Sequence, residues 1–170
     1  MKIFVKLFLV AAVLVMCGNA ASAQKFGTIN VQELLMAMPD RDSAISKLQK
    51  FEEELGSQME AMQVELNTKY LDYQKKQDSL TVAMRQLKEK ELEDYQRRMQ
   101  EFQQMAQQDY QKMQQDLMTP VLNKAQESIK KVGKAQGLTF VFDVSSGSVI
   151  YQDAATVVDI LPLVKQDLGI

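Results

Sequence analysis

The sequence predicts an α+β protein that is predominantly helical, with a small β-rich body and a long antiparallel coiled-coil hairpin. Two runs of apolar residues at helical spacing, separated by one turn signal, predict the hairpin over residues 40–118. Short β-forming runs near both ends of the chain predict the body, at residues 24–39 and 119–170. The body is therefore discontinuous in sequence, and the hairpin is inserted into it.

The first 23 residues have the pattern of an export signal. Lys2 and Lys6 precede an apolar run over residues 7–16, and the tripeptide of small residues that a signal peptidase requires ends at Ala23. A run of about 10 residues is well short of the roughly 20 that span a bilayer as a helix. We expect residues 1–23 to be a signal peptide cleaved after Ala23, and the mature chain to be soluble.

The single cysteine, Cys17, lies inside this signal. A lipoprotein site needs a small residue before the modified cysteine, and the bulky Met16 at that position disfavours a lipid anchor. Cleavage after Ala23 removes Cys17, so we expect no disulfide, no thiol nucleophile and no thiolate metal site in the mature chain.

The composition argues against catalysis and nucleic-acid binding. The chain has no His, which is the commonest general base and neutral metal ligand, and it has no glycine-rich phosphate loop. The mature chain has 18 basic residues against 22 acidic ones, whereas phosphate backbones require a basic surface. Consecutive residues Glu52, Glu53 and Glu54 diverge around a helix and cannot converge on one metal ion. We therefore expect no enzyme, no cofactor, no metal and no nucleic-acid partner.

The mature chain begins with a predicted strand over residues 25–29. Asn30 and Glu33 have the spacing of a capping box, in which each side chain accepts a hydrogen bond from the other residue's backbone N–H. A short helix should follow and end before Pro39, because the residue before a proline disfavours the helical conformation.

Two apolar stripes define the hairpin, with a turn near residues 77–81, where Asp78 and Ser79 offer a new helix start. Each arm of roughly 36 residues would extend about 50 Å. We expect Met59, Met62, Met99 and Met113 to fill the seam between the arms, rather than to contact other molecules. The first stripe contains Ile45, Leu48, Leu55, Met59, Met62, Leu66, Tyr70 and Tyr73, and the second contains Met84, Leu87, Leu92, Tyr95, Met99, Phe102, Ala106, Tyr110, Met113 and Leu117.

Beyond the hairpin the second helix should kink at Pro120, because helical spacing resumes after it, and should stop at Gly137. Residues 138–142 and 148–151 are β-prone and flank a turn, which predicts a β-hairpin. Asp159 should cap a final helix.

The predicted body contains only 68 residues, 16 before Asp40 and 52 from Thr119 onward. A unit of this size has a marginal core. Its strands are also apolar on their outer faces. We therefore expect homo-oligomerisation through the body.

The order of these elements resembles the Skp/OmpH family of periplasmic chaperones. The resemblance covers nearly the whole mature chain, through residues 26–31, the Gln-, Glu- and Lys-rich hairpin, and residues 129–134, 138–143 and 159–170. It implies a periplasmic homotrimer whose β-rich trimerisation body carries three helical tentacles around a cavity. It also implies an ATP-independent holdase that binds unfolded outer-membrane proteins, with transient contact to membrane surfaces.

One departure from the family is charge, because the well-known members are strongly basic and this mature chain is net acidic. Residues 69–98 nevertheless contain 8 basic residues against 6 acidic ones. Apolar residues near the turn also have few partners within the chain, so we expect unfolded proteins to bind there. The predicted client-binding residues are Leu71, Lys75, Lys76, Leu80, Val82, Met84, Arg85, Leu87 and Lys88.

A second function class remains open at this point, namely a structural coiled-coil protein of the cell envelope that binds one dedicated partner. A rod of this kind would have a sealed seam and a specific tip. The helix defect at Gly56 and the kink at Pro120 favour flexing arms, which suit a holdase better.

Overall fold

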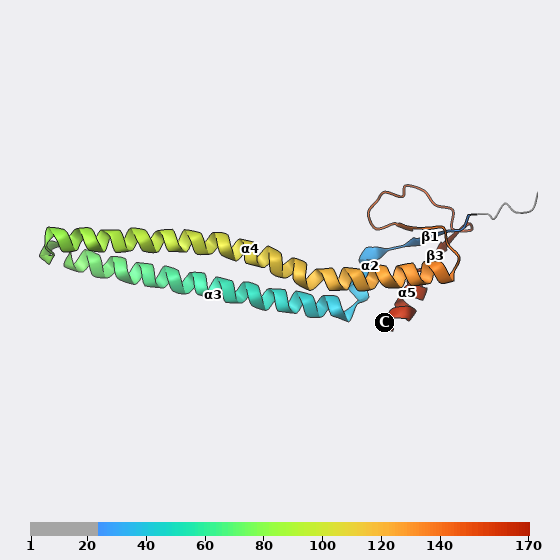
Figure 1. Ribbon diagram of the computed structural model, residues 1–170, viewed down its shortest axis with the longest axis horizontal. Helices are drawn as coiled ribbons and strands as arrows, with labels where there is room; N and C mark the ends of the chain where they lie inside the picture. Colours follow the sequence, from blue (N-terminus) through green and yellow to red (C-terminus); the bar gives the residue numbers. More distant parts are fainter. Residues whose placement is uncertain (1–23) are drawn as a thin grey trace, which may run out of the picture. The chain divides into compact units, whose positions relative to one another are not determined.

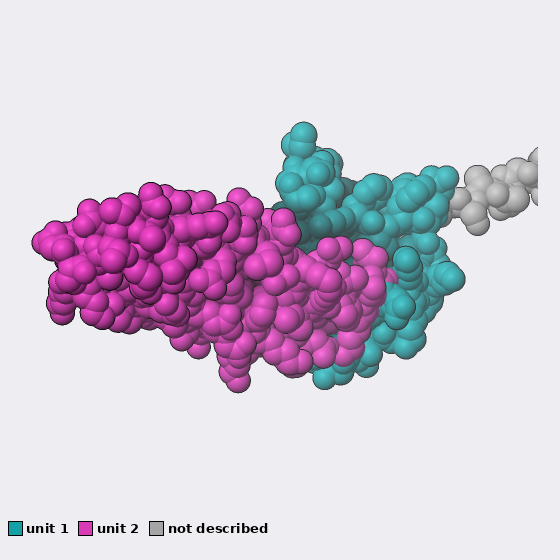
Figure 2. Space-filling model, turned by 60° about the vertical axis from the view of Figure 1, so that its left-hand side comes forward, with its two compact units in different colours: residues 1–34, 127–170 teal, residues 35–126 magenta. Residues whose placement is uncertain are grey.

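The structure is a computed structural model that describes residues 24–170, so the predicted signal peptide, its cleavage site and Cys17 lie outside the described residues. The chain divides into two compact units (Figure 2): the body, described over residues 24–34 and 127–170, and the hairpin unit, residues 35–126. The elements in chain order are β1 (Phe26–Ile29), α2 (Val31–Ala37), α3 (Pro39–Lys76), the short 3-10 helix η2 (Gln77–Ser79), α4 (Val82–Ala135), β2 (Phe140–Asp143), β3 (Val157–Asp159) and α5 (Leu161–Leu168). The predicted fold class, α+β and predominantly helical, is confirmed.

A three-stranded parallel sheet lies at the centre of the body. β1 is the middle strand, with Phe26 opposite Phe140 of β2 and Gly27 opposite Val158 of β3. Parallel neighbours need long connections, and the connection from β1 to β2 contains the whole hairpin. Gly27 allows the close packing here, because a Cβ at that position would lie 2.5 Å from Leu138 Cδ1 and 3.3 Å from the Val158 carbonyl oxygen.

The predicted β-hairpin of residues 138–142 and 148–151 is wrong. β2 forms, but residues 148–151 have no regular structure, and the next strand along the chain is β3, which pairs with β1. Asp143 explains where β2 ends, because its Oδ1 accepts the N–H of Val31 at 3.3 Å and the N–H of Ser145 at 2.8 Å. These bonds hold the end of β2 to the end of β1, and the chain turns away instead of doubling back.

Helix α5 completes the body and is attached to α4 by a charged contact. The Asp167 carboxylate accepts a 2.8 Å hydrogen bond from the Ser128 hydroxyl and pairs with the Lys131 ammonium at 2.5 Å. The Lys131 ammonium has the larger effect and the Ser128 hydroxyl the smaller one, and both lower the pKa of Asp167. The most deeply buried apolar side chains of the body are Ile29, Leu34, Ile160 and Val164.

Two predicted caps are present in the body, one of them in altered form. Asp159 Oδ1 accepts the N–H of Leu161 at 3.0 Å, and Asn30 Oδ1 accepts the N–H of Glu33 at 2.9 Å. The Glu33 carboxylate does not return to Asn30, because it binds the Lys165 ammonium of α5 at 2.8 Å. The expected capping box is therefore only half formed, and Glu33 joins α2 to α5 instead.

In the hairpin unit α3 and α4 lie side by side and antiparallel (Figure 1). α3 has 38 residues, which at 1.5 Å per residue gives a length of about 57 Å. The turn lies at η2 as predicted, but Thr81 rather than Asp78 or Ser79 starts α4. Thr81 Oγ1 accepts the N–H of Met84 at 3.3 Å, while the Ser79 hydroxyl donates to the Lys76 carbonyl at 2.8 Å at the end of α3.

α4 is one helix of 54 residues with Pro120 inside it. The helix continues past Pro120, as the resumed spacing predicts, and Gly137 follows its end with a φ of +64°, the predicted left-handed stop. Near the base of the hairpin, Lys124 Nζ pairs with Asp40 Oδ2 at 2.6 Å and joins α4 to the start of α3.

The apolar stripes form a seam that is only partly shielded from water. Tyr95 is buried, with 4% of its surface exposed, but the stripe residues from Ile45 to Leu66 and the others from Leu92 to Leu117 are half-buried. Met59, Met62, Met99 and Met113 are half-buried on the apolar stripes, which agrees with their predicted place in the seam but leaves part of each side chain open to other molecules. Two helices alone cannot enclose a seam, so these side chains retain contact with solvent.

Candidate functional site

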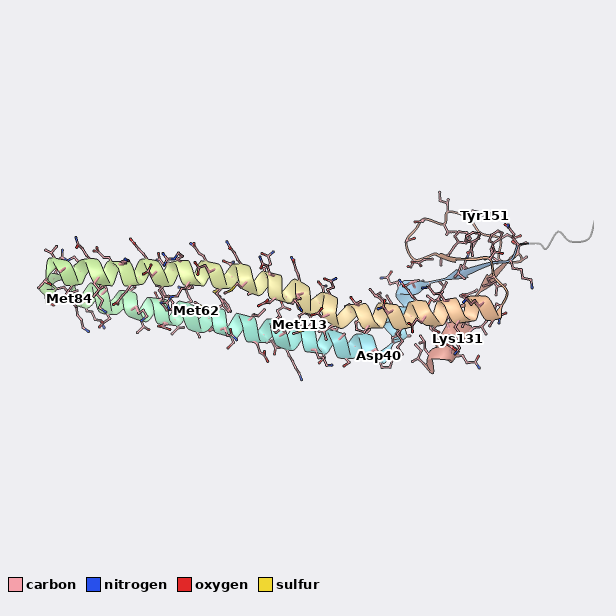
Figure 3. The ribbon with its side chains drawn as sticks, viewed as in Figure 1. Asp40, Met62, Met84, Met113, Lys131 and Tyr151 are labelled. Carbon is pink, nitrogen blue, oxygen red and sulfur yellow. The ribbon has the colours of Figure 1, made fainter. Side chains whose placement is uncertain are left out.

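The nine predicted client-binding residues come together at the turn of the hairpin unit. Three of them lie in the last turns of α3, Leu80 lies in the turn itself, and the remaining five lie in the first turns of α4. Figure 3 labels Met84 at this end of the hairpin. Because the arms are antiparallel, the end of one helix and the start of the next necessarily present their side chains side by side.

Four large apolar side chains at this end are exposed, and we call Leu71, Val82, Met84 and Leu87 the tip patch. Val82 is 72% exposed and Leu71 is 52% exposed. Leu87 and Met84 are 50% and 44% exposed, although the stripe pattern places both in the seam. Leu80 differs from them, since it is half-buried. Val82, Met84 and Leu87 face solvent in the first turns of α4, and Leu71 faces solvent in α3 two residues before Tyr73, which still bonds across to Glu89 of α4.

The four predicted cations at the tip differ in how they are engaged. Lys76 pairs with Asp72 at 2.7 Å, and Lys88 pairs with Glu91 at 2.7 Å, which raises the pKa of Lys88. Arg85 donates to the Gln77 carbonyl at 3.0 Å. Within residues 24–170, Lys75 makes no ion pair. Lys75 is therefore the tip cation whose charge is most available to another molecule.

Two tyrosine–carboxylate hydrogen bonds cross the hairpin, and no local sequence pattern predicts them. The Tyr73 hydroxyl donates to Glu89 at 2.5 Å, and the Tyr95 hydroxyl donates to Glu65 at 2.8 Å. The first bond raises the pKa of Tyr73. The second, with help from Lys69, lowers the pKa of Glu65, while burial and the same bond raise the pKa of Tyr95. These cross-arm rungs hold α3 against α4 near the tip.

Cations gather around the buried Tyr95 ring. The Lys69 ammonium lies 5.7 Å from the ring centroid, and the Arg98 guanidinium carbon lies 4.8 Å from it, within the range of a cation–π contact. Arg97 is directed elsewhere and binds Asp94 at 2.7 Å. The distal half of the hairpin thus combines exposed apolar groups with cations held by aromatic rings and carboxylates.

The body presents a separate apolar surface on its sheet. The rings of Phe26, Phe140 and Phe142 lie 6.1 to 6.3 Å apart, centroid to centroid, and Phe140 and Phe142 are 57% and 45% exposed. Phe26 and Phe142 also line a hollow of about 730 Å³ together with the loop that contains Ile150 and Tyr151. Those two loop side chains are 98% and 84% exposed, and Figure 3 labels Tyr151 on this loop.

These surfaces consist of exposed apolar side chains, aromatic rings and charged groups. Across residues 24–170, no three His, Cys, Asp or Glu side chains gather in an arrangement that would hold a metal ion. In that same described range, no helix combines the length and the apolar character needed to cross a bilayer. The exposed tip patch, the tip cations and the aromatic sheet face are the features that could engage other macromolecules.

Comparisons with known proteins find similarity over most of the chain. The sequence profile of the family described as outer membrane protein (OmpH-like) matches residues 25–168. A solved chain from Caulobacter crescentus, described as a candidate outer membrane chaperone (OmpH-like), superposes with a TM-score of 0.73 at 13% identity, covering 88% of this chain and 86% of that one. No curated protein matches the sequence.

Proposed function

The chain belongs to the OmpH-like family, and on this premise we propose that it is an ATP-independent holdase chaperone of the periplasm. It binds unfolded outer-membrane proteins and prevents their aggregation while they cross the envelope. It acts by binding alone, without catalysis or a cofactor, and its partners are unfolded chains and further copies of itself in a homotrimer.

The tip patch is the observation that carries this proposal. Its four apolar side chains, exposed by 44 to 72%, lie beside the tip cations at the end of a long hairpin. Exposed apolar groups gathered at one place mark an interaction surface. The patch includes the unbranched, polarisable side chain of Met84, which can adapt to different partners, and this favours contact with many sequences over contact with one shaped partner. Unfolded chains offer apolar groups of that unselective kind.

The sheet face of the body supports the assembly part of the proposal. Three phenylalanine rings form one cluster there, and two of them are about half exposed. A body of this size buries a small core, and covering such a face with a second copy adds apolar burial that the single chain lacks. A trimer also brings several hairpins together, so that one client contacts more than one tip patch.

The test is light scattering of a urea-denatured outer-membrane β-barrel protein diluted into buffer, without nucleotide and with the mature protein in stoichiometric excess. Val82→Ser with Leu87→Ser should weaken suppression of aggregation. Val64→Ser with Met105→Ser is the matched control, because these two residues are 60% and 54% exposed elsewhere in the hairpin. Unchanged scattering with several unrelated clients would reject the general holdase and point to the alternative, a coiled-coil envelope protein with one dedicated partner.

A further inference from the structure

A groove of about 340 Å³ opens along the seam of the hairpin unit, between α3 and α4. Three apolar residues lie in it, Met59 and Leu66 from α3 and Met99 from α4. Its volume is at the lower end of the range of roughly 300–1,000 Å³ that ligand pockets have. The groove lies next to the rung formed by Tyr95 and Glu65, on the side away from the tip.

The remaining lining residues of the groove are all glutamines. Each side chain has two N–H donors and one carbonyl acceptor, and all four are exposed. The side-chain hydrogen bonds found next to the groove within residues 24–170 join Tyr95 to Glu65 and Arg97 to Asp94. Neither bond involves a glutamine of the groove, so the hydrogen-bonding groups of these amides face solvent. The four are Gln63 from α3 and Gln96, Gln100 and Gln103 from α4.

Two neighbouring hollows nearer the tip differ in chemistry. One is lined by Lys69, Glu91, Asp94, Arg97 and Arg98, and the other also contains several charged side chains. Many of these charges are already paired, as in the 2.7 Å contacts of Arg97 with Asp94 and of Lys88 with Glu91. The glutamine groove has no charged lining residue, so it selects neither acidic nor basic ligands.

We propose that this groove is a subsite for an extended segment of unfolded polypeptide, bound without regard to its sequence. The glutamine amides donate to the client's backbone carbonyls and accept from its backbone N–H groups, which every residue except proline supplies. The thioethers of Met59 and Met99 adapt to whichever side chain enters, because they are unbranched and polarisable. This inference rests on the proposed holdase function, and it adds a second contact that is independent of the tip patch.

An extended polypeptide fits the lining better than other ligands do. A nucleic acid or lipid phosphate would need fixed positive charge in the lining, which the groove lacks. A folded protein has already paired most of its backbone groups, whereas an unfolded chain exposes them along its whole length. In an extended chain alternate side chains point the same way, so one can enter the groove while adjacent backbone groups meet the amides.

The test compares two double substitutions that make the same chemical change at the same spacing on α4. Gln96→Glu with Gln100→Glu replaces two groove amides by carboxylates that can no longer donate. Gln104→Glu with Gln108→Glu adds the same charge at exposed positions that do not line the groove. The probe is a fluorophore-labelled, urea-denatured outer-membrane β-barrel protein, titrated with each variant after circular dichroism and sedimentation confirm its fold and assembly.

We expect the groove pair to weaken client binding about tenfold, as the loss of two hydrogen bonds would, and the control pair to change it less than twofold. A benzophenone side chain at position 100 should also crosslink to clients of opposite net charge more strongly than one at position 104. If the two pairs bind clients equally, or if positions 100 and 104 crosslink equally, the groove is not a client-binding subsite. The holdase function would still stand in that case, provided that the unmodified protein binds clients. Absence of binding by the unmodified protein rejects both.

Discussion

The hydroxyl of Tyr95 in α4 donates a 2.8 Å hydrogen bond to the carboxylate of Glu65 in α3, across 30 residues of sequence. Tyr73 and Glu89 repeat the arrangement nearer the turn. Most seam side chains are only half-buried, so apolar packing by itself resists sliding of one arm along the other only weakly. Hydrogen bonds are directional, so the two rungs fix the register of the arms where the tip patch is displayed.

Tyr95→Phe removes one rung and keeps the ring. We expect it to lower the thermal unfolding midpoint by about 2–4 °C, the effect of an average hydrogen bond in a protein of this size. Tyr110→Phe is the control, since Tyr110 belongs to the same apolar stripe, where it is half-buried, but forms no comparable rung in the described chain. Circular dichroism during heating measures both, and equal shifts in the two variants would contradict a role for the rung.

The same rung should make stability depend on pH in two directions. The pKa of Glu65 is lowered from its ordinary 4.5, so its contribution is complete above that value and is lost as the pH falls through the folded pKa. The pKa of Tyr95 is raised from 10.0, so its contribution is complete below that value and is lost as the pH rises through the folded pKa. The difference in unfolding midpoint between the native protein and Tyr95→Phe should therefore be largest near neutral pH. A difference that stays constant into acid would show that the Glu65 charge is not involved.

Two glycines predict opposite responses to one substitution. Gly27→Ala should lower the free energy of unfolding by about 1–3 kcal/mol, because the new Cβ would overlap Leu138 and crowd the Val158 carbonyl. Gly56→Ala should raise it by roughly 0.5–1 kcal/mol, because Gly56 is an exposed position inside α3 with open space around it. Urea unfolding of both variants gives the sign directly, and a stable Gly27→Ala protein would mean that the sheet can shift to admit the methyl group.

The helical part of the fold follows from sequence because its determinants are local. The spacing from Ile45 to Leu66 and from Leu92 to Leu117 identifies the seam, and Gly137 identifies the end of α4. At the turn the local signals compete: Asp78, Ser79 and Thr81 can all start a helix, and only the hydrogen bond to Met84 shows that Thr81 does. Propensity alone does not rank such neighbours.

The sheet was harder to predict because its pairing joins residues more than a hundred positions apart. The bond from Val31 to Asp143 spans 112 positions. Nothing in the local sequence of residues 148–151, which are β-prone, indicates that they stay outside the sheet and that β3 pairs with β1 instead. The candidate site likewise has a part that local sequence predicts and a part that depends on long-range pairing. Exposure at the tip could be predicted, since Val82 starts α4 directly after the turn and Leu71 lies outside the apolar stripe of α3, but the tyrosine rungs require the exact register of two arms.

Phe140→Glu should weaken the proposed self-association of the body. Phe140 is 57% exposed in the aromatic cluster of the sheet, and a carboxylate there could not be buried against another copy without a large desolvation cost. Val64→Glu introduces the same charge at a 60% exposed apolar position of α3 and should leave the mass unchanged. Sedimentation velocity distinguishes the two variants. A native mass for Phe140→Glu, or a native protein that is monomeric, would argue against assembly through this face.

Charge reversal at Lys75 tests whether the tip cations attract clients. Lys75→Glu changes a tip cation that has no ion pair in the described chain, so the substitution breaks none of the ion pairs found there. Binding of an acidic unfolded client should weaken about two- to fivefold at low ionic strength, the scale of exposed ion pairs, and the difference should vanish in concentrated salt. Lys50→Glu makes the same change at an exposed position of α3 remote from the turn and serves as the control. If both variants weaken binding equally, only the net charge of the protein matters and the tip has no special electrostatic role. A loss confined to Lys75→Glu would instead place client attraction where the tip patch is exposed, so that charge brings the unfolded chain to the apolar groups that hold it.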